Sequence, residues 1–252
     1  MTFDFPSSAQ RNQLLALWKQ TFGDHAGFWE MFLETTFLPD HCRCVTENGL
    51  ITAAMYWFDC CLRGEKIAYL YAVVTHPDHR GKGLCRRLLK DVHKHLAKTG
   101  YESAMLVPET EALRQMYRKL GYEDCTTASE FFCTAGDSPL SLRAIGPAEY
   151  AALRRELLPR NSVLQEGENL TFLAQQAQFF AGDRFLLTAW QDKGTLHAME
   201  FLGDRSIAPA ILRTLNCTQG HFRTPGTGKP FAMFHPLSTD AAKPDYFGFA
   251  FD

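Results

Sequence analysis

The first part of the chain shows the hydrophobic spacing of helices. Apolar residues recur at helical spacing in QRNQLLALWKQTF (10–22) and again in HAGFWEMFLETTF (25–37). Gly23 is a typical residue for ending the first helix, and Asp24 can cap the second. The pattern therefore predicts two adjacent amphipathic helices.

The hydrophobic pattern then becomes that of strands. Three strand-like runs follow one another: HCRCVTE (41–47), ITAAMYWFDCCLR (51–63) and KIAYLYAVVT (66–75). The breaks between them contain ENG and RGEK, which have the composition of tight turns. We therefore expect an antiparallel meander of three strands.

A basic helix, a strand and another helix are expected after the meander. Apolar residues four positions apart form one stripe over residues 84–96, and basic side chains occupy the other faces. ESAMLV (102–107) is typical of a strand, and PETEALRQMYRKLG (108–121) of a helix. ASEFFCT (128–134) predicts one more strand, and AGDSP (135–139) has the composition of a linker.

The second half of the chain repeats this order of elements in outline. The runs expected to form helices or strands are SLRAI (141–145), AEYAALRRELL (148–158), GENLTFLAQQAQFF (167–180), DRFLLTAW (183–190), GTLHAMEFL (194–202), RSIAPAILRTL (205–215), KPFAMFHPL (229–237) and YFGFAFD (246–252). The repeated order suggests a diverged internal duplication. We predict an α/β protein with mixed sheets and two domains, residues 1–136 and residues 137–252.

Composition and charge argue against several classes of protein. The chain has 252 residues, 46% of them hydrophobic, which is ample for a packed core. The net charge of −2 gives no sign of a nucleic-acid partner. No apolar run reaches transmembrane length, and MTFDFPSSAQRNQ lacks the basic and apolar regions of a secretory signal. We expect no contact with a membrane.

The eight cysteines include no C-x-x-C pair, so we expect them to be reduced and the protein to be cytoplasmic. Cys42 and Cys44, with His41 beside them, raise the question of a metal site. Residues two apart on a strand share one face, and thiols behave as small apolar groups. We therefore expect both cysteines to face the core, and we expect no metal.

The stretch THPDHRGKGLC (75–85) lies between the third strand and the basic helix. The first N–H groups of a helix lack partners, and the helix dipole places about half a positive charge there. Gly81 and Gly83 permit a left-handed backbone and have no Cβ to hold a ligand away. Because basic side chains flank both glycines, the pattern predicts a pyrophosphate site.

Two better-known phosphate motifs do not fit this chain. GKGLCR lacks the third glycine of the dinucleotide fingerprint, and Leu84 follows Gly83 where a P-loop has lysine. TPGTGKP (224–230) looks like a phosphate loop, but Pro230 follows its lysine and no helix pattern comes next. We expect a hairpin loop there, with nucleotide binding as a rival hypothesis.

Two phrases of the sequence resemble the GNAT superfamily of acyl-CoA-dependent N-acyltransferases. Arg80–Cys85 stands in the place of the family loop Q/R-x-x-G-x-G/A, with Cys85 replacing the final small residue. MYRKLGYED (116–124) follows at the family's usual separation, and the resemblance covers residues 10–133. The second half is similar to two-domain bacterial members related to aminoglycoside acetyltransferases. The resemblance implies a GNAT fold with splayed central strands, then a degenerate GNAT-like copy in which residues 201–205 replace the loop.

The resemblance also implies acetyl-CoA as co-substrate and assigns residues to it. Backbone groups of Val73, Val74 and Thr75 would meet the pantetheine arm. The residues implied in pyrophosphate binding are Arg80, Gly81, Lys82, Gly83, Leu84, Cys85 and Arg86. Tyr117 matches a tyrosine that lies near the CoA sulfur in many members, whereas Thr110 replaces an asparagine that begins the same helix.

The implied reaction is direct attack of an amine on the thioester in a ternary complex. A tyrosine pKa near 10 exceeds a thiol pKa near 8.5, so complete proton transfer from Tyr117 is uphill by about 2 kcal/mol. We therefore expect Tyr117 to donate a hydrogen bond to the leaving thiolate. The candidate general bases are Glu109, His76, the terminal carboxylate of Asp252 and water. Cys85 begins a helix, a position that lowers thiol pKa values.

The sequence leaves several alternatives for the acceptor substrate and for the oligomeric state. A small-molecule amine is the first expectation and a protein amine the second, with a homodimer possible. Phe28, Trp29 and Phe32 could line an acceptor pocket, although their spacing favours the core. The C-terminal domain is expected to shape the acceptor site or a dimer surface. A non-catalytic acyl-CoA-binding sensor is the alternative hypothesis.

Overall fold

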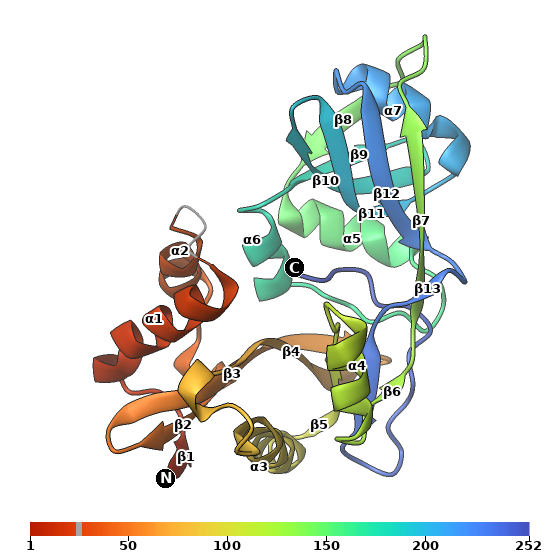
Figure 1. Cartoon of the computed structure of the whole chain (residues 1–252). Helices are drawn as coiled ribbons and strands as arrows, with labels where there is room; N and C mark the ends of the chain where they lie inside the picture. The colour runs from red at the N-terminus through yellow and green to blue at the C-terminus, as the bar shows by residue number, and fades with distance from the viewer. Residues whose placement is uncertain (24–26, 252) are drawn as a thin grey trace.

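The computed structural model describes residues 1–23 and 27–251 and contains two mixed sheets of seven strands each (Figure 1). The strand order is β1-β2-β3-β4-β5-β14-β6 in the first sheet and β13-β7-β12-β11-β10-β9-β8 in the second. The expected mixed α/β class is confirmed. The cap expected at Asp24 lies outside the described residues.

The first sheet has helices on both faces. Its elements are β1 (Thr2–Asp4), α1 (Arg11–Phe22), α2 (Phe28–Thr35), β2 (Cys42–Glu47), β3 (Leu50–Leu62), β4 (Glu65–Thr75), α3 (Leu84–Lys98), β5 (Tyr101–Leu106), α4 (Glu111–Arg118) and β6 (Glu123–Asp124). The stripe of α3 packs on one face of β2, β3 and β4. Helices α1 and α2 pack on the other face, where Cys42 and Cys44 are buried as expected.

The second sheet repeats the order of elements of the first. Its elements are β7 (Thr127–Thr134), β8 (Leu142–Ile145), α5 (Pro147–Leu157), α6 (Glu168–Leu173), β9 (Gln178–Gly182), β10 (Phe185–Asp192), β11 (Thr195–Leu202), α7 (Ala208–Thr214), β12 (Gln219–Pro225) and β13 (Lys229–Pro230). In both sheets a strand and two helices precede an antiparallel meander, and a helix then leads to a parallel strand.

The two sheets exchange strands. β14 (Met233–Pro236) comes from the second half of the chain but pairs with β5 and β6 in the first sheet. β7 comes from the first half but pairs with β12 and β13 in the second. The division at residues 136 and 137 stays a prediction, and the exchange means that each half completes the other's sheet.

Three local expectations are wrong. Residues 167–180 were expected as one helix, but α6 ends at Leu173 and β9 begins at Gln178. TPGTGKP is no hairpin loop, because β12 and β13 lie on opposite edges of β7 and the loop passes from one edge to the other. Of the expected strand YFGFAFD, the described residues 246–251 are buried without belonging to any strand.

The central strands β4 and β5 separate partway along their length. Their parallel pairing runs from Lys66 opposite Tyr101 to Tyr69 opposite Met105 and then stops. Beyond Tyr69, β4 continues to Thr75 paired only with β3. The sheet therefore opens between β4 and β5, as the resemblance implied. Among residues 1–23 and 27–251, no helix combines the length and apolar character that a membrane crossing requires.

Candidate functional site

A cavity of about 520 Å³ lies where β4 and β5 separate. Its lining comes from α1, α2, both splayed strands, α4 and the end of the chain. The lining residues are Phe22, Phe28, Trp29, Tyr69, Leu70, Tyr71, Ala72, Val73, Leu106, Val107, Pro108, Glu109, Leu113, Tyr117, Gln176, Ala250 and Phe251. The size and the largely apolar lining are those of a small-molecule site.

A bulge in β4 lies on this lining. Tyr71 pairs with Tyr56 and Val74 with Ala54, so Met55 faces two residues, Ala72 and Val73. A bulge leaves one residue outside the regular ladder. Ala72 has a φ of 50°, a conformation that side chains other than glycine rarely adopt.

The bulge is fixed from behind by a buried hydrogen bond. The indole Nε1 of Trp18, on α1, donates to the carbonyl oxygen of Ala72 at 3.1 Å. Because Trp18 is fully buried, water does not compete for this bond, and the carbonyl is held in a defined direction. The sequence pattern indicated Trp18 as a core residue and gave no sign of this role.

Tyr117 lies on α4 and lines the cavity, and its place near the CoA sulfur stays a prediction. Burial raises the pKa of its phenol, and the neighbouring Cys85 thiol raises it further. The hydroxyl therefore stays protonated at neutral pH. It makes no hydrogen bond to the part of the chain that the structure describes, so it is available as a donor.

The glycine loop has the form of an anion cradle. Gly81 and Gly83 adopt left-handed φ values of 75° and 71°, and a Cβ at either would meet nothing within 4 Å. No backbone N–H from Gly81 to Arg86 donates a hydrogen bond to a described residue, whereas the N–H groups of Arg80 and Arg87 both do. Six consecutive donors are thus free at the N-terminus of α3, a helix of 15 residues.

The basic side chains of the loop divide into two kinds. Arg80 Nε donates to the carbonyl of Thr75 at 3.1 Å, and Lys82 Nζ donates to that of Asp78 at 2.9 Å, so both stabilise the turn. Arg86 instead lines a second cavity of about 210 Å³ together with Lys90 and other residues of α3 and the α4 end. The lining residues of this second cavity are Arg86, Leu89, Lys90, His93, Lys119 and Leu120.

The remaining residues of the loop and of β4 differ in how far they are buried. Val74 and Leu84 are buried, whereas Val73 lines the cavity. Burial raises the pKa of Cys85 to about 11, so the expected lowering at a helix start is wrong. The cause is the loss of water around the thiol, because desolvation disfavours the thiolate. Cys85 packs against the hydrophobic core near Tyr117, and its raised pKa disfavours the thiolate form.

The candidate bases lie in different places. Glu109 lines the cavity at an exposed position just before α4. His76 is outside the lining, and its Nδ1 accepts from the N–H of Asp78 at 3.3 Å. The terminal carboxylate of Asp252 lies outside the described residues, although its neighbour Phe251 lines the cavity. Thr110 caps α4 by accepting from the N–H of Leu113.

The cavity includes residues that the sequence reasoning missed. Phe22, Gln176 and Phe251 all contribute to the lining, and the last two come from the second half of the chain. Of the aromatic residues weighed for a pocket, Phe28 and Trp29 line it, whereas Phe32 is fully buried. The aromatic run FGFAF was the only signal for Phe251, and its pattern indicated a strand.

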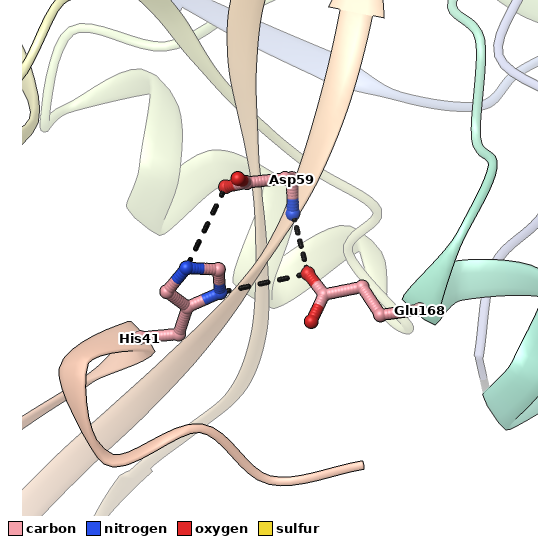
Figure 2. A group of neighbouring side chains, drawn as sticks. All are labelled: His41, Asp59 and Glu168. Atoms are coloured by element: carbon pink, nitrogen blue, oxygen red, sulfur yellow. Dashed lines mark hydrogen bonds and ion pairs between the residues drawn. The ribbon is translucent and has the colours of Figure 1, made fainter.

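A second cluster of polar side chains joins the two halves (Figure 2). His41 lies between Asp59 on β3 and Glu168 on α6: its Nε2 is 3.9 Å from Asp59 Oδ1 and its Nδ1 is 3.5 Å from Glu168 Oε1. The N–H of Asp59 also donates to Glu168 at 2.8 Å. Because opposite ring nitrogens face the two carboxylates, the geometry fits a protonated histidine better than a metal ion.

The charged groups of this cluster come from both halves of the chain. Burial lowers the pKa of His41, but the hydrogen-bonding and charge of Glu168, with Asp59 and Asp40, outweigh it and raise the pKa above 6.5. Tyr101 donates a short hydrogen bond to Asp59, and the N–H of Asp59 satisfies one oxygen of Glu168. The cluster is a contact between halves and lies outside the cavity lining.

Comparison with protein families identifies the first half of the chain. Residues 5–125 match the family model described as an acetyltransferase (GNAT) domain. The splayed strands, the glycine loop before α3 and this match agree, and residues 5–125 form a domain of the GNAT superfamily. The resemblance seen in the sequence is thus confirmed. No curated protein sequence matches the chain.

Solved structures share the fold over nearly the whole chain. A GCN5-related N-acetyltransferase from Kribbella flavida superposes with a TM-score of 0.72 at 18% identity, covering 95% of this chain and 73% of that one. One from Anabaena variabilis has a TM-score of 0.74 at 12% identity, with 94% and 73% covered. Eis1 from Mycobacterium abscessus has a TM-score of 0.71 at 11% identity, with 95% and 74% covered. At these identities the likeness shows the fold.

Proposed function

We propose that this protein is an acetyl-CoA-dependent N-acetyltransferase that moves an acetyl group to an amine by direct attack in a ternary complex. The observation that carries the proposal is that the strand lining the cavity leads directly into the glycine loop. The free N–H groups of Gly81–Arg86 lie at the start of α3, and β4, which precedes this loop, lines the cavity with Ala72 and Val73. A long ligand with a pyrophosphate at one end and a reactive group at the other suits both.

The loop fits the pyrophosphate of CoA. Six N–H donors, two glycines without Cβ and a helix dipole offer charge-assisted hydrogen bonds at no conformational cost. Arg86, Lys90 and Lys119 line the neighbouring cavity and supply positive charge for a further phosphate group of the same ligand. The pantetheine arm would then run along the open edge of β4 at Val73, Val74 and Thr75.

The bulge in β4 and Tyr117 suit the thioester end of acetyl-CoA. A backbone N–H released from the ladder at Ala72–Val73 would donate to the thioester carbonyl, where negative charge develops during attack. The hydroxyl of Tyr117 would donate to the sulfur as the C–S bond breaks. Because its pKa is raised, Tyr117 stabilises the thiolate by hydrogen bonding and keeps its proton.

The amine must lose a proton, and Glu109 is the carboxylate available to accept it. Deprotonating an amine of pKa near 10.4 at pH 7 costs about 4.6 kcal/mol, whereas an amine of pKa near 8 costs about 1.4 kcal/mol. Among the described residues that line the cavity, Glu109 is the only one with a carboxylate. We assign it this role, acting directly or through water.

Calorimetric titration with acetyl-CoA tests the binding half of the proposal. Gly83→Ala places a methyl group in the cradle, and we expect it to weaken acetyl-CoA binding by about tenfold or more. Gly49→Ala is the matched control, because Gly49 has a φ of 81° and an equally open Cβ position but lies in the β2–β3 turn. Equal affinities of the two variants would contradict the assigned cradle.

Thiol release in the presence of amines tests the catalytic half. We expect CoA thiol to appear only when acetyl-CoA and an amine are both present, as a ternary mechanism requires. Tight acetyl-CoA binding without thiol release on any amine would instead support the non-catalytic sensor.

A further inference from the structure

A large share of the cavity lining consists of aromatic rings. These rings come from α1, α2, β4 and the end of the chain, and they are Phe22, Phe28, Trp29, Tyr69, Tyr71 and Phe251. Trp29 is central: its ring centroid lies 4.9 Å from Phe28 and 6.3 Å from Tyr71. We call this set of six side chains the aromatic wall.

The aromatic wall is held in place from both halves of the chain. The N–H of Phe251 donates to the hydroxyl of Tyr69 at 3.2 Å, and the two rings lie 5.4 Å apart. Trp29 Nε1 donates to the carbonyl of Gly23 at 3.1 Å. These bonds fix the direction of the rings, so the wall offers preformed flat surfaces.

Charge is scarce in the cavity. Glu109 is the only charged residue in the lining as far as the structure describes it, and it is exposed at the mouth. Gln176 adds one neutral amide. A ligand with one ammonium group can pair with Glu109 and lie against aromatic faces, which attract cations. A second ammonium group on the same ligand would find no second carboxylate among the described lining residues, which is unfavourable.

We propose that the acceptor is an arylalkyl primary amine, a small molecule with one amino group and one aromatic ring system. This inference rests on the proposed function and specifies its acceptor. The ring packs against the aromatic wall, and the amino group points toward the bulge in β4, where the thioester carbonyl would be bound. The cavity of about 520 Å³ is shared with the acyl end of the co-substrate, so a single or fused ring system fits, but a long polyamine does not.

Steady-state thiol release with three amines on the full-length protein tests the inference. Phenethylamine carries the proposed ring, ethanolamine lacks it, and spermidine carries several charges. We expect kcat/KM for phenethylamine to exceed the other two values by about tenfold or more, the range for filling or leaving empty an apolar pocket. Higher or equal kcat/KM for spermidine or ethanolamine would overturn the inference while leaving the proposed function intact.

Substitutions within the wall locate the effect. Phe28 is only half-buried, so Phe28→Ala is expected to fold and to raise KM for phenethylamine about tenfold, with the acetyl-CoA affinity unchanged. Phe28→Leu should give an intermediate KM. Phe132→Ala is the matched control, because Phe132 is an aromatic side chain, 78% exposed, on β7. Equal KM values for all variants would overturn the assignment of the wall. Absence of thiol release with every amine would overturn the proposed function, and this inference with it.

Discussion

Tyr117 is the residue whose chemistry the structure defines most narrowly. Its ring lines the cavity from α4, and burial together with the neighbouring Cys85 thiol raises its pKa. A phenol in that setting can donate a hydrogen bond to a developing thiolate but holds its own proton. Donation without full transfer therefore stays the role that we propose for Tyr117.

Replacing Tyr117 by phenylalanine tests this role. We expect kcat to fall about 10- to 100-fold, because one donor to a developing negative charge is removed. Acetyl-CoA affinity should change little, since the hydroxyl acts mainly as the C–S bond breaks. The kinetics of thiol release and calorimetric titration measure the two quantities. An unchanged kcat would show that Tyr117 is only a packing residue.

The wild-type pH profile supplies a second check on Tyr117. Because its pKa is raised above the ordinary value of 10, its ionisation should not lower kcat at any pH up to about 10. A loss of kcat between pH 8 and 9 that disappears in Tyr117→Phe would contradict the protonated donor.

Residues 246–251 belong to no helix or strand, but buried side chains of the second sheet hold this segment in place. Glu200, buried in the second sheet, accepts hydrogen bonds from Arg154 at 2.7 and 2.8 Å and from the hydroxyls of Tyr150 and Tyr246. A Cβ on Gly248 would come within 2.1 Å of Glu200. The anchor therefore requires glycine there, and it leads the chain to the aromatic wall at Phe251.

Gly248→Ala is expected to lower the free energy of unfolding by about 1–3 kcal/mol, because the added methyl group must displace a buried ion pair. Phe251 would shift with the segment, so KM for the amine should rise more than the Kd of acetyl-CoA. Gly146→Ala is the control, since a Cβ there meets nothing within 4 Å. Chemical denaturation and steady-state kinetics measure the effects. Equal stability of both variants would argue against the anchor.

The sequence predicts most helices and strands well, but it predicts poorly which strands pair with one another. Helical spacing located α1, α3 and α4, and turn composition located the meander of β2 to β4. The exchange of β7 and β14 could not be predicted, because each is an apolar strand and no local pattern states which sheet it joins. The loop of residues 80–86 was found because its chemistry is local in the chain.

The lining of the cavity was harder to predict for the same reason. Phe22, Gln176 and Phe251 are more than 70 residues apart in the sequence and meet only after both halves have packed. Glu168 likewise meets His41 only across the interface. Residues that act through long-range contacts leave no periodic signal in a single sequence.

For the whole molecule, the two halves depend on each other. Each sheet takes one strand from the other half, α6 packs on β3 (Figure 1), and one hydrophobic core extends across both. The cluster of His41, Asp59 and Glu168 lies at this junction (Figure 2). Unfolding of one half should therefore expose the core of the other, and we expect a single cooperative transition.

The raised pKa of His41 makes part of this stability depend on pH. A histidine whose pKa is raised on folding contributes stability that is full below the unfolded value near 6.5 and is lost as pH rises through the folded value. We expect wild type to exceed His41→Gln in stability by about 1 kcal/mol below pH 6, with a smaller difference at pH 8. Urea denaturation of both proteins at several pH values measures this.

His76→Gln controls for the loss of a histidine as such, because His76 lies in the loop before α3, where its imidazole contacts Asp78 and His79 of the same loop. If the difference between wild type and His41→Gln grew as the pH rose, the sign of the linkage would be wrong and the cluster would not hold a proton between the two carboxylates.

A crystal structure of the full chain with CoA tests the central claim most directly. We predict that the pyrophosphate accepts hydrogen bonds from N–H groups of Gly81–Arg86, and that the thiol lies in the opening between β4 and β5 within hydrogen-bonding distance of the Tyr117 hydroxyl. CoA bound elsewhere, or bound at the loop with its thiol directed away from the cavity, would contradict the account.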